Sequence, residues 1–535
     1  MTYLVAVYPN SYKDSICLLE ATRAVLAAPG VEWGWALMAT PANIAILEQE
    51  GFTSGLAEAS ANDLLFAVRA EDDEAAQAAI SIAKEALFGS TTGSEDDEQE
   101  AAPDMRAALK EHPSANIAII SVPGSYAALE AHKAMTNGLH VLLFSDNVPL
   151  ADEIALKRRA RELGRLVMGP GAGTAMLAGT GLGFANRVKP GPVGIAAATG
   201  TGAQEVMSLL DRWGIGISHV IGVGGRDLSP EVGGLMAEAA IRALDADEGT
   251  ESILLVSKPP SPKVATKLLN LPTKPMVAAL IGLSDPLPAP AHVIVCNTLE
   301  QGAAHTLELL DKAQPDIIGD LFADVTVAIT ALKPNRTRLA GLFSGGTLCY
   351  EAMTIASQHI GPIYSNTPLN KEWTVDAAPS GGHVCLDLGE EEYTDGRPHP
   401  MIDSEARIEH LQRQAEDPTV AVILLDIVIG DGAHTDPASL LAPIAADIVR
   451  SGTAMVVYVL GTEQDPQGFE SQRTAFRQAG CIVTETAARA ALAAAALVLR
   501  EPALVTADLP AGLSAGLSGN QTPRLKTSMA SQKST

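Results

Sequence analysis

Two short segments rich in glycine and hydroxyl side chains, TGTG over 199–202 and SGGT over 344–347, contain the residue types best suited to binding an anion. Each follows a small apolar run that predicts a buried parallel strand, and each leads directly into a helical pattern. The first N–H groups of a helix have no partner inside the helix and lie at the positive end of its dipole. Such a turn can therefore hold a phosphate, and glycine lets a ligand approach the backbone closely. The residues predicted to bind phosphate are Thr199, Gly200, Thr201, Gly202, Ser344, Gly345, Gly346 and Thr347.

The two segments belong to longer stretches that are near copies of each other. When Gly200 is aligned with Gly346, both stretches share the pattern Gly-Thr-x-x-x-Glu-x-Met. A single glycine-rich turn is as often an ordinary strand–helix connection, because short motifs produce many false positives. The repetition favours two related α/β domains that point two helix N-termini at one shared phosphate. Glu205 and Glu351, one turn into the two helices, are interpreted as cap partners of those helices.

Other polar residues follow further predicted strands, at the edge where open parallel sheets bind their ligands. The two catalytic candidates are Arg226 in GVGGRD and His434 in GDGAHTDP. Arg226 could balance the charge of an anionic substrate or form a surface salt bridge. His434 could polarise a carbonyl group or shuttle a proton, and a loop-stabilising role fits its position equally well. The further site candidates, of which the two aspartates could also be simple loop caps, are Gly225, Asp387, Asp431, Arg397 and His399.

The composition excludes several classes of protein. The 37 Lys and Arg residues stand against 63 Asp and Glu, and a formal net charge of −26 argues against nucleic acid and anionic membranes as partners. The five cysteines show no CxxC pair or metal-ligand spacing, so no metal site is predicted. The first residues lack the basic start and apolar core of a signal peptide, and no uncharged apolar run approaches the ~18 residues of a membrane span. We expect a reduced, cytoplasmic protein that captures an anionic substrate with local donors.

The length of 535 residues predicts several domains, since one domain averages ~150 residues. The predicted fold class is α/β: a Rossmann-like domain and two flavodoxin-like parallel-sheet domains follow an N-terminal ferredoxin-like α+β module. For the module we favour a docking or regulatory role without chemistry. The predicted segments are the ferredoxin-like module at 1–88, an acidic linker and lead-in at 89–114, the Rossmann-like domain at 115–188, flavodoxin-like domains at 189–332 and 333–508, and a disordered tail at 509–535.

Ordered motifs in the last three quarters of the chain resemble the succinyl-CoA synthetases. From about Ala115 to Gly249 the chain is similar to the α subunit, through SVPGSYAALEAHKAM, RLVMGPGAGTAML and PVGIAAATGTGAQEV in that order. From Arg338 to about Leu499 it is similar to the carboxyl-terminal ligase domain of the β subunit. The combination of SGGTLCYEAM, GRPHPMID and GDGAHTDPA most resembles the FdrA proteins. The resemblance implies a CoA-binding-type domain at 115–188, two ligase-like domains after it, and glycine-rich turns that face a phosphorylated intermediate.

Three features of the synthetases have no counterpart in this sequence. The segment between VGG at 232–234 and the second turn leaves no room for an ATP-grasp nucleotide domain. The place of the synthetases' phosphorylated histidine reads GLSDPLPAPAHVIV, in which His292 starts an apolar strand. The CoA-binding-type domain begins without its usual glycine-rich turn. A complete acyl-CoA synthetase is therefore not expected, the sequence requires no cofactor, and a need for Mg²⁺ stays open.

The resemblance to FdrA proteins implies a transferase, namely a subunit of oxamate carbamoyltransferase in purine ureide (allantoin) catabolism. That reaction moves a carbamoyl group between oxamate and phosphate, by way of oxalurate and carbamoyl phosphate, and two helix N-termini could hold such anions. Two alternatives stay open: an acyl-CoA synthetase, an acid–thiol ligase whose missing parts come from a partner, and a non-catalytic scaffold subunit. In each case we expect small anionic ligands and a hetero-oligomer with other subunits of the same pathway.

Overall fold

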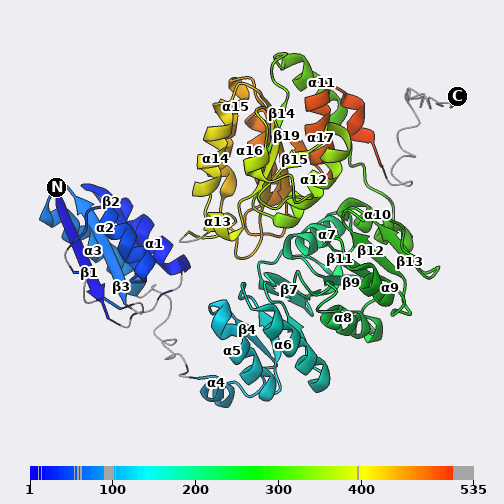
Figure 1. The fold of residues 1–535 in the computed structure, drawn as a ribbon, viewed down its shortest axis with the longest axis horizontal. Helices are drawn as coiled ribbons and strands as arrows, with labels where there is room; N and C mark the ends of the chain where they lie inside the picture. Colours follow the sequence, from blue (N-terminus) through cyan, green and yellow to red (C-terminus); the bar gives the residue numbers. More distant parts are fainter. Residues whose placement is uncertain are drawn as a thin grey trace. The chain divides into compact units, whose positions relative to one another are not determined.

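A computed structural model describes residues 1–509 except for 10, 12, 14, 54, 57, 58, 61, 62, 89–101, 103, 284, 395 and 396. The chain forms two compact units, one made of 1–102 with 395–398 and the other of 103–394 with 399–535 (Figure 1). Most of the predicted acidic linker, and positions 510–535 of the predicted tail, lie outside the described residues. Within the described residues, no helix combines the length and the apolar character needed to cross a bilayer.

The N-terminal unit alternates strands and helices around one antiparallel sheet of order β1-β3-β2. Its α3 buries Ala76, Ala79, Ile80 and Ala83, a helical spacing that presents one apolar face to the core. This is the α+β alternation expected for the module. Its elements are β1 (Thr2–Tyr8), α1 (Ser15–Leu26), β2 (Val31–Met38), α2 (Pro41–Gln49), β3 (Leu64–Ala70) and α3 (Asp73–Phe88).

The second unit begins with a small parallel sheet of order β4-β5-β6. A short helix before it, α4, was not predicted; Asp104 caps it by accepting the N–H of Ala107 at 2.8 Å. The elements are α4 (Met105–Glu111), β4 (Ile117–Ile120), α5 (Gly124–Thr136), β5 (His140–Leu143), α6 (Leu150–Leu163) and β6 (Val167–Met168).

A seven-stranded sheet of order β13-β12-β11-β9-β10-β7-β8 follows, with β9 in its middle. The strands from β9 to β13 are parallel, whereas β7 and β8 form an antiparallel edge. The strands are β7 (Thr174–Leu177), β8 (Thr180–Gly183), β9 (Pro190–Ala197), β10 (Ile217–Gly222), β11 (Ser252–Ser257), β12 (Met276–Leu280) and β13 (Val293–Cys296). The helices are α7 (Gly200–Arg212), α8 (Leu235–Ala246), α9 (Pro262–Leu269) and α10 (Leu299–Leu309).

The third sheet of this unit has six parallel strands in the order β15-β16-β14-β17-β18-β19. The strands are β14 (Arg338–Phe343), β15 (Ile363–Tyr364), β16 (His383–Asp387), β17 (Val420–Val428), β18 (Ala454–Leu460) and β19 (Ile482–Thr484). The helices are α11 (Leu321–Ala331), α12 (Gly346–Ile360), α13 (Glu391–Thr394), α14 (Glu405–Ala415), α15 (Pro437–Arg450), α16 (Phe469–Gln478) and α17 (Ala487–Leu499), with short 3₁₀ turns η1 (Val375–Ala377) and η2 (Pro502–Thr506).

One apolar core joins the two larger sheets. It includes Val193 of β9 and Leu339 of β14 together with the buried faces of α7, α10, α12 and α17. The alanine-rich α17 is buried along almost its whole length, because small side chains let it pack closely against α12 and β17. The shared core fixes β9–α7 against β14–α12, so the two near-copied stretches meet inside one packed body. The predicted α/β class with parallel sheets is confirmed.

Candidate functional site

Both glycine-rich segments form the strand–turn–helix connections that the sequence predicts. β9 ends at Ala197 and α7 begins at Gly200, with the Thr199 hydroxyl accepting the N–H of Gly202 at 3.4 Å as an N-cap. β14 ends at Phe343 and α12 begins at Gly346, without a side-chain cap from Gly345. The two turns are thus similar in backbone but differ in how their first N–H groups are satisfied.

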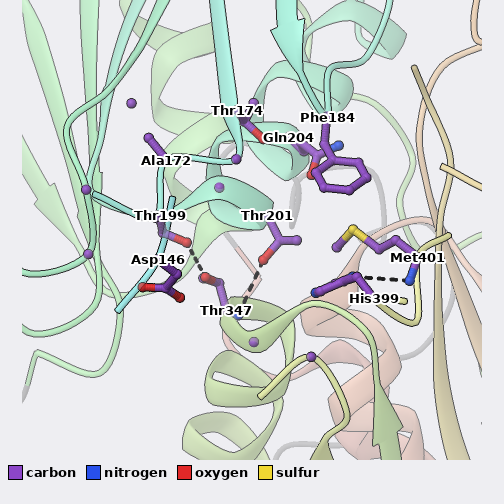
Figure 2. A pocket seen from close by; sticks show the side chains of 18 of the residues that line it. Asp146, Ala172, Thr174, Phe184, Thr199, Thr201, Gln204, Thr347, His399 and Met401 are labelled. Atoms are coloured by element: carbon purple, nitrogen blue, oxygen red, sulfur yellow. Dashed lines mark hydrogen bonds between the residues drawn. The ribbon is translucent and has the colours of Figure 1, made fainter. Parts of the chain in front are cut away.

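The two helix N-termini face each other directly (Figure 2). The N–H of Thr347 donates to Oγ1 of Thr201 at 3.3 Å, and the hydroxyls of Thr199 and Thr347 share a short hydrogen bond. A side chain would be crowded at both Gly202 and Gly345. A Cβ at Gly202 would lie 2.5 Å from the methyl carbon of Thr199 and 3.2 Å from that of Thr347, and one at Gly345 would lie 3.0 Å from that of Thr201. These two glycines therefore let the helices approach each other.

A cavity of about 620 Å³ opens at this junction. Most of the sequence-predicted residues line it: Thr199, Gly200, Thr201, Gly225, Ser344, Gly346, Thr347, Asp387 and His399. Gly202 and Gly345 are not among the lining residues. The apolar part of the wall includes Phe144, Phe184 and Met401, and Phe184 lies 5.8 Å from Phe144 between ring centroids. The cavity therefore has a polar end at the turns and an apolar wall.

A buried carboxylate that the sequence analysis missed holds the second turn. Asp426 of β17 accepts the N–H groups of Ser344 and Gly345, both at 2.8 Å, and its Oδ1 lies 3.2 Å from the guanidinium of Arg407. The available signal was a single charged residue within the apolar run of β17, since a buried charge needs a partner. Because Asp426 occupies two donors, the N–H groups that remain without a partner at this junction, among the described residues, are those of Thr199, Gly200 and Thr201 at the first turn and of Gly346 and Leu348 at the second.

The charged side chains around the cavity do not favour an anion by themselves. Lys258 is accompanied by four carboxylates, which are Asp146, Asp387, Glu390 and Glu391. Burial, and then the nearby Glu390, raise the pKa of Asp387 from 3.8 to about 6. Any phosphate at this site would have to be held by backbone N–H groups and hydroxyls, and the negative charge of Asp387 is removed only as the pH falls through its pKa of about 6.

Neither of the two catalytic candidates lines the cavity. Arg226 donates to Glu153 at 2.8 Å and to the Val148 carbonyl at 2.6 Å, which is the salt-bridge alternative. His434 accepts the N–H of Asp436 on Nδ1 at 3.0 Å. Neither is among the lining residues, so the geometry gives no support to a catalytic role for either.

Two further candidates also lie outside the cavity lining. Asp431 forms an ion pair of 2.8 Å with Arg187, and Arg397 is an exposed residue. The sequence placed both in polar loops after strands, but it contained no information on which side of the sheet edge each loop faces.

The repeated glutamates do not cap their own helices, and that interpretation is wrong. Glu351 of α12 accepts the N–H of Leu299 at 2.6 Å, at the start of α10. Glu205 of α7 accepts the hydroxyl of Tyr458 at 2.5 Å and the N–H of Ala487 at 3.4 Å, at the start of α17. The helix α12 of the six-stranded-sheet half thus caps α10 of the seven-stranded-sheet half, and α7 of the seven-stranded-sheet half caps α17 of the six-stranded-sheet half. Burial raises the pKa of Glu351 to about 8 and that of Glu205 to about 7.

The chain matches known proteins along most of its length. A family model for CoA-ligase matches residues 342–497, and one for a CoA binding domain matches 188–281. The uncharacterized protein YahF of Escherichia coli (strain K12) is 37% identical over 515 residues, which cover 92% of this chain and 98% of YahF. The chain belongs to the YahF family.

Narrower matches connect this family to acid–thiol ligases. Subunit alpha 2 of a succinate–CoA ligase [ADP-forming] of Archaeoglobus fulgidus is 30% identical over 178 residues, covering 32% of this chain and 61% of that subunit. SauD, a subunit of an ADP-forming sulfoacetate-CoA ligase of Bilophila wadsworthia, is 29% identical over 215 residues, covering 37% and 71%. A solved dinucleotide-forming acetyl-coenzyme A synthetase 1 of Ca. Korarchaeum cryptofilum covers 74% of this chain and 85% of its own at 16% identity, but its TM-score of 0.29 supports no conclusion.

These matches correct the predicted activity. The transferase prediction, with its carbamoyl group, oxamate and carbamoyl phosphate, is wrong, because the segment that contains the second turn belongs to a CoA-ligase model and the first turn to a CoA-binding model. The resemblance to succinyl-CoA synthetases is confirmed by the relatives, whereas the narrower one to an FdrA-type carbamoyltransferase subunit is not.

A third family model, described as "AllF, heavy metal-associated domain", matches residues 1–103. The donors in that segment do not fit a soft heavy metal, since Cys17 is its one cysteine and it contains no histidine. Across the described part of the chain, no group of three or more His, Cys, Asp or Glu side chains is arranged to hold a metal ion. We therefore assign no metal chemistry to the N-terminal unit.

Proposed function

We propose that this chain acts in acid–thiol ligase chemistry, and that its cavity holds the phosphate that is exchanged with a thioester. In this reaction a phosphate oxygen attacks the carbonyl carbon of an acyl-CoA, the carbon–sulfur bond breaks, and an acyl phosphate and a protonated CoA thiol are formed. One observation supports this function most directly: two helix N-termini, one in the segment matched by the CoA binding model and one in the segment matched by the CoA-ligase model, face one cavity.

The residues at the junction suit this step. The N–H groups of Gly200, Thr201 and Gly346 are aligned at two positive helix ends and would hold a phosphate without competing protein acceptors. The hydroxyls of Thr199 and Thr347 lie at the same place and can accept or donate as the phosphate changes its protonation. Donors fixed by two packed helices need no reorganisation when charge develops, which is the usual source of electrostatic rate enhancement.

A partner chain would supply the nucleotide site. The residues between β12 and β14 are taken up by β13, α10 and α11, which agrees with the absence of room for an ATP-grasp domain inferred from the sequence. We therefore propose a hetero-oligomer in which another subunit couples acyl phosphate to ATP. His292 is the histidine within the segment that stands at the place of the synthetases' phosphorylated histidine. Its Nε2 lies 2.9 Å from the Pro272 carbonyl oxygen, and the residue is not among those that line the cavity. This position accords with the proposal that another subunit couples the acyl phosphate to ATP. A cytoplasmic location stays a prediction.

Phosphate-dependent release of thiol from acyl-CoA thioesters tests the proposal. The protein is incubated with acetyl-CoA, propionyl-CoA or succinyl-CoA, and free thiol is followed with phosphate, with arsenate, and with chloride alone. We expect release with phosphate or arsenate. Thr347→Val, which removes a cavity hydroxyl without changing the shape of the side chain, should lower it at least ~10-fold, on the scale of lost transition-state donors. Thr326→Val is the matched control, because Thr326 donates within its own helix α11. Thiol release that ignores phosphate, or is absent with every thioester, would overturn the proposal.

A further inference from the structure

His399 lines the cavity from the segment that follows α13. Its Nδ1 accepts the backbone N–H of Met401 at 3.2 Å. Figure 2 shows the imidazole between Met401 and Thr347, with this hydrogen bond on the side of Met401. In a neutral ring, an Nδ1 that accepts leaves the proton on Nε2. The backbone therefore fixes His399 as an Nε2–H donor.

The ring is neutral at physiological pH. Burial, and then the positive charge of Arg407, lower the pKa of His399 from 6.5 to about 4. Its role is thus that of a constant hydrogen-bond donor rather than of a base that titrates near neutrality.

Nε2 of His399 lies close to Gly389, where a side chain would clash with it. A Cβ at Gly389 would lie 2.8 Å from Nε2 of His399 and 3.2 Å from Oδ1 of Asp387. On the other side of Asp387, a Cβ at Gly346 would overlap Oδ2. Asp387 and His399 therefore both lie next to Gly389, and Asp387 also lies next to the N-terminus of α12. Among the described residues, Nε2 has no hydrogen-bond partner of its own.

The surroundings of the donor are apolar as well as polar. The imidazole lies 6.0 Å from the ring of Phe184 between centroids, at an angle of 42°. A ligand anchored by its phosphate at the turns would therefore meet, next to the second turn, an aromatic wall with one N–H donor. That combination suits a carbonyl group on a short carbon chain, since the carbonyl oxygen accepts one hydrogen bond and the attached carbons contact the ring.

We propose that Nε2–H of His399 donates a hydrogen bond to the acyl carbonyl oxygen of a ligand whose phosphate rests on the two helix N-termini. The site then recognises an acyl phosphate of a small carboxylic acid rather than phosphate alone. The inference rests on the proposed function and adds the residue that binds the acyl group of the ligand. By polarising the carbonyl, the same N–H would also support attack on that carbon.

Paired titrations with inorganic phosphate and acetyl phosphate test this role by calorimetry. In His399→Phe, which keeps a ring but loses the donor, we expect phosphate affinity within twofold of the wild type and acetyl phosphate affinity about three- to tenfold lower, the size of one hydrogen bond. His399→Gln, which restores an N–H near the position of Nε2, should recover part of the loss. His305→Phe is the control, because His305 pairs with Glu308 on the exposed side of α10.

An infrared difference spectrum gives a readout that a purely structural role would not change. The carbonyl stretch of bound ¹³C-labelled acetyl phosphate should lie lower in the wild type and in His305→Phe than in His399→Phe. Normal phosphate binding with an unchanged preference for acetyl phosphate in His399→Phe would overturn this inference alone. Equal loss of both ligands in a folded His399→Phe protein would also overturn it. Failure of the wild type to bind phosphate would instead overturn the proposed function, and the inference with it.

Discussion

Replacing Glu351 by glutamine should change the pH dependence of stability in a defined direction. The carboxyl group is buried between the two halves of the second unit, where one oxygen accepts the N–H of Leu299 at 2.6 Å and the other, Oε2, has no hydrogen-bond partner. Burial raises its pKa from 4.5 to about 8, against the smaller effect of that backbone N–H. The nearby carboxylates Glu205 and Glu300 raise it further. Glutamine keeps an oxygen for Leu299 but cannot ionise.

The sign follows from proton binding. Between the unfolded pKa of 4.5 and the folded value of about 8, the folded protein holds a proton that the unfolded chain has released. The contribution of Glu351 to stability is therefore fully present below pH 4.5 and is lost as the pH rises through 8. The size of the shift corresponds to roughly 5 kcal/mol at the alkaline end, as an order of magnitude for a carboxyl group that interacts with Glu205.

Thermal unfolding at intervals from pH 5 to pH 8.5 measures this effect. Relative to the wild type, Glu351→Gln should gain several degrees in Tm as the pH rises, and Glu205→Gln should gain less, since the pKa of Glu205 is about 7. Glu130→Gln on α5, where Glu130 pairs with Lys133, serves as the control and should show no such trend. A Tm difference between Glu351→Gln and the wild type that does not vary with pH would refute the reasoning.

Three further changes have expected outcomes. Sulfate, which stays a dianion from pH 5 to pH 8, should bind the cavity more tightly as the pH falls through about 6, because Asp387 becomes protonated there. Calorimetry over this pH range should show the trend in the wild type and none in Asp387→Asn. Asp426→Asn leaves the buried Arg407 without its carboxylate and should cost about 3–5 kcal/mol, seen as a large drop in Tm. Gly346→Ala should also lower the Tm, because the added Cβ overlaps Asp387. Gly200→Ala should not lower it, since its Cβ would lie 3.5 Å from the nearest atom, Oγ1 of Thr174. Equal effects of the two substitutions on the Tm would contradict the geometry.

Local patterns were enough to predict most of the fold. Apolar runs that lead into glycine-rich turns and helical patterns predicted β9–α7 and β14–α12 directly, because both signals come from residues close in sequence. The same patterns predicted that the two turns share one ligand site, and the structure brings them into contact. The short α4 was missed because seven residues give too little periodicity to recognise.

The contacts between distant segments could not be predicted in this way. Asp426 reaches the second turn from β17, and Glu351 reaches α10 of the other half, so neither role follows from a neighbouring residue. His399 was a candidate by residue type, but its place in the cavity depends on the path of a loop that has no repeated pattern. The transferase prediction was wrong because it was carried over from the resemblance to FdrA proteins. The turns themselves could not correct it, since similar turns serve different reactions and do not identify the group that phosphate attacks or receives.

The central claim is that one phosphate binds between the two turns, and titration of the protein with inorganic phosphate tests it most directly. Gly200→Val provides the comparison: position 200 has room for a Cβ, so the fold should survive, while the added methyl groups block approach to its N–H. We predict saturable binding of one phosphate per chain in the wild type and in Thr326→Val, and no measurable binding in a folded Gly200→Val protein. Undiminished phosphate binding by Gly200→Val, or no binding by the wild type, would contradict the account.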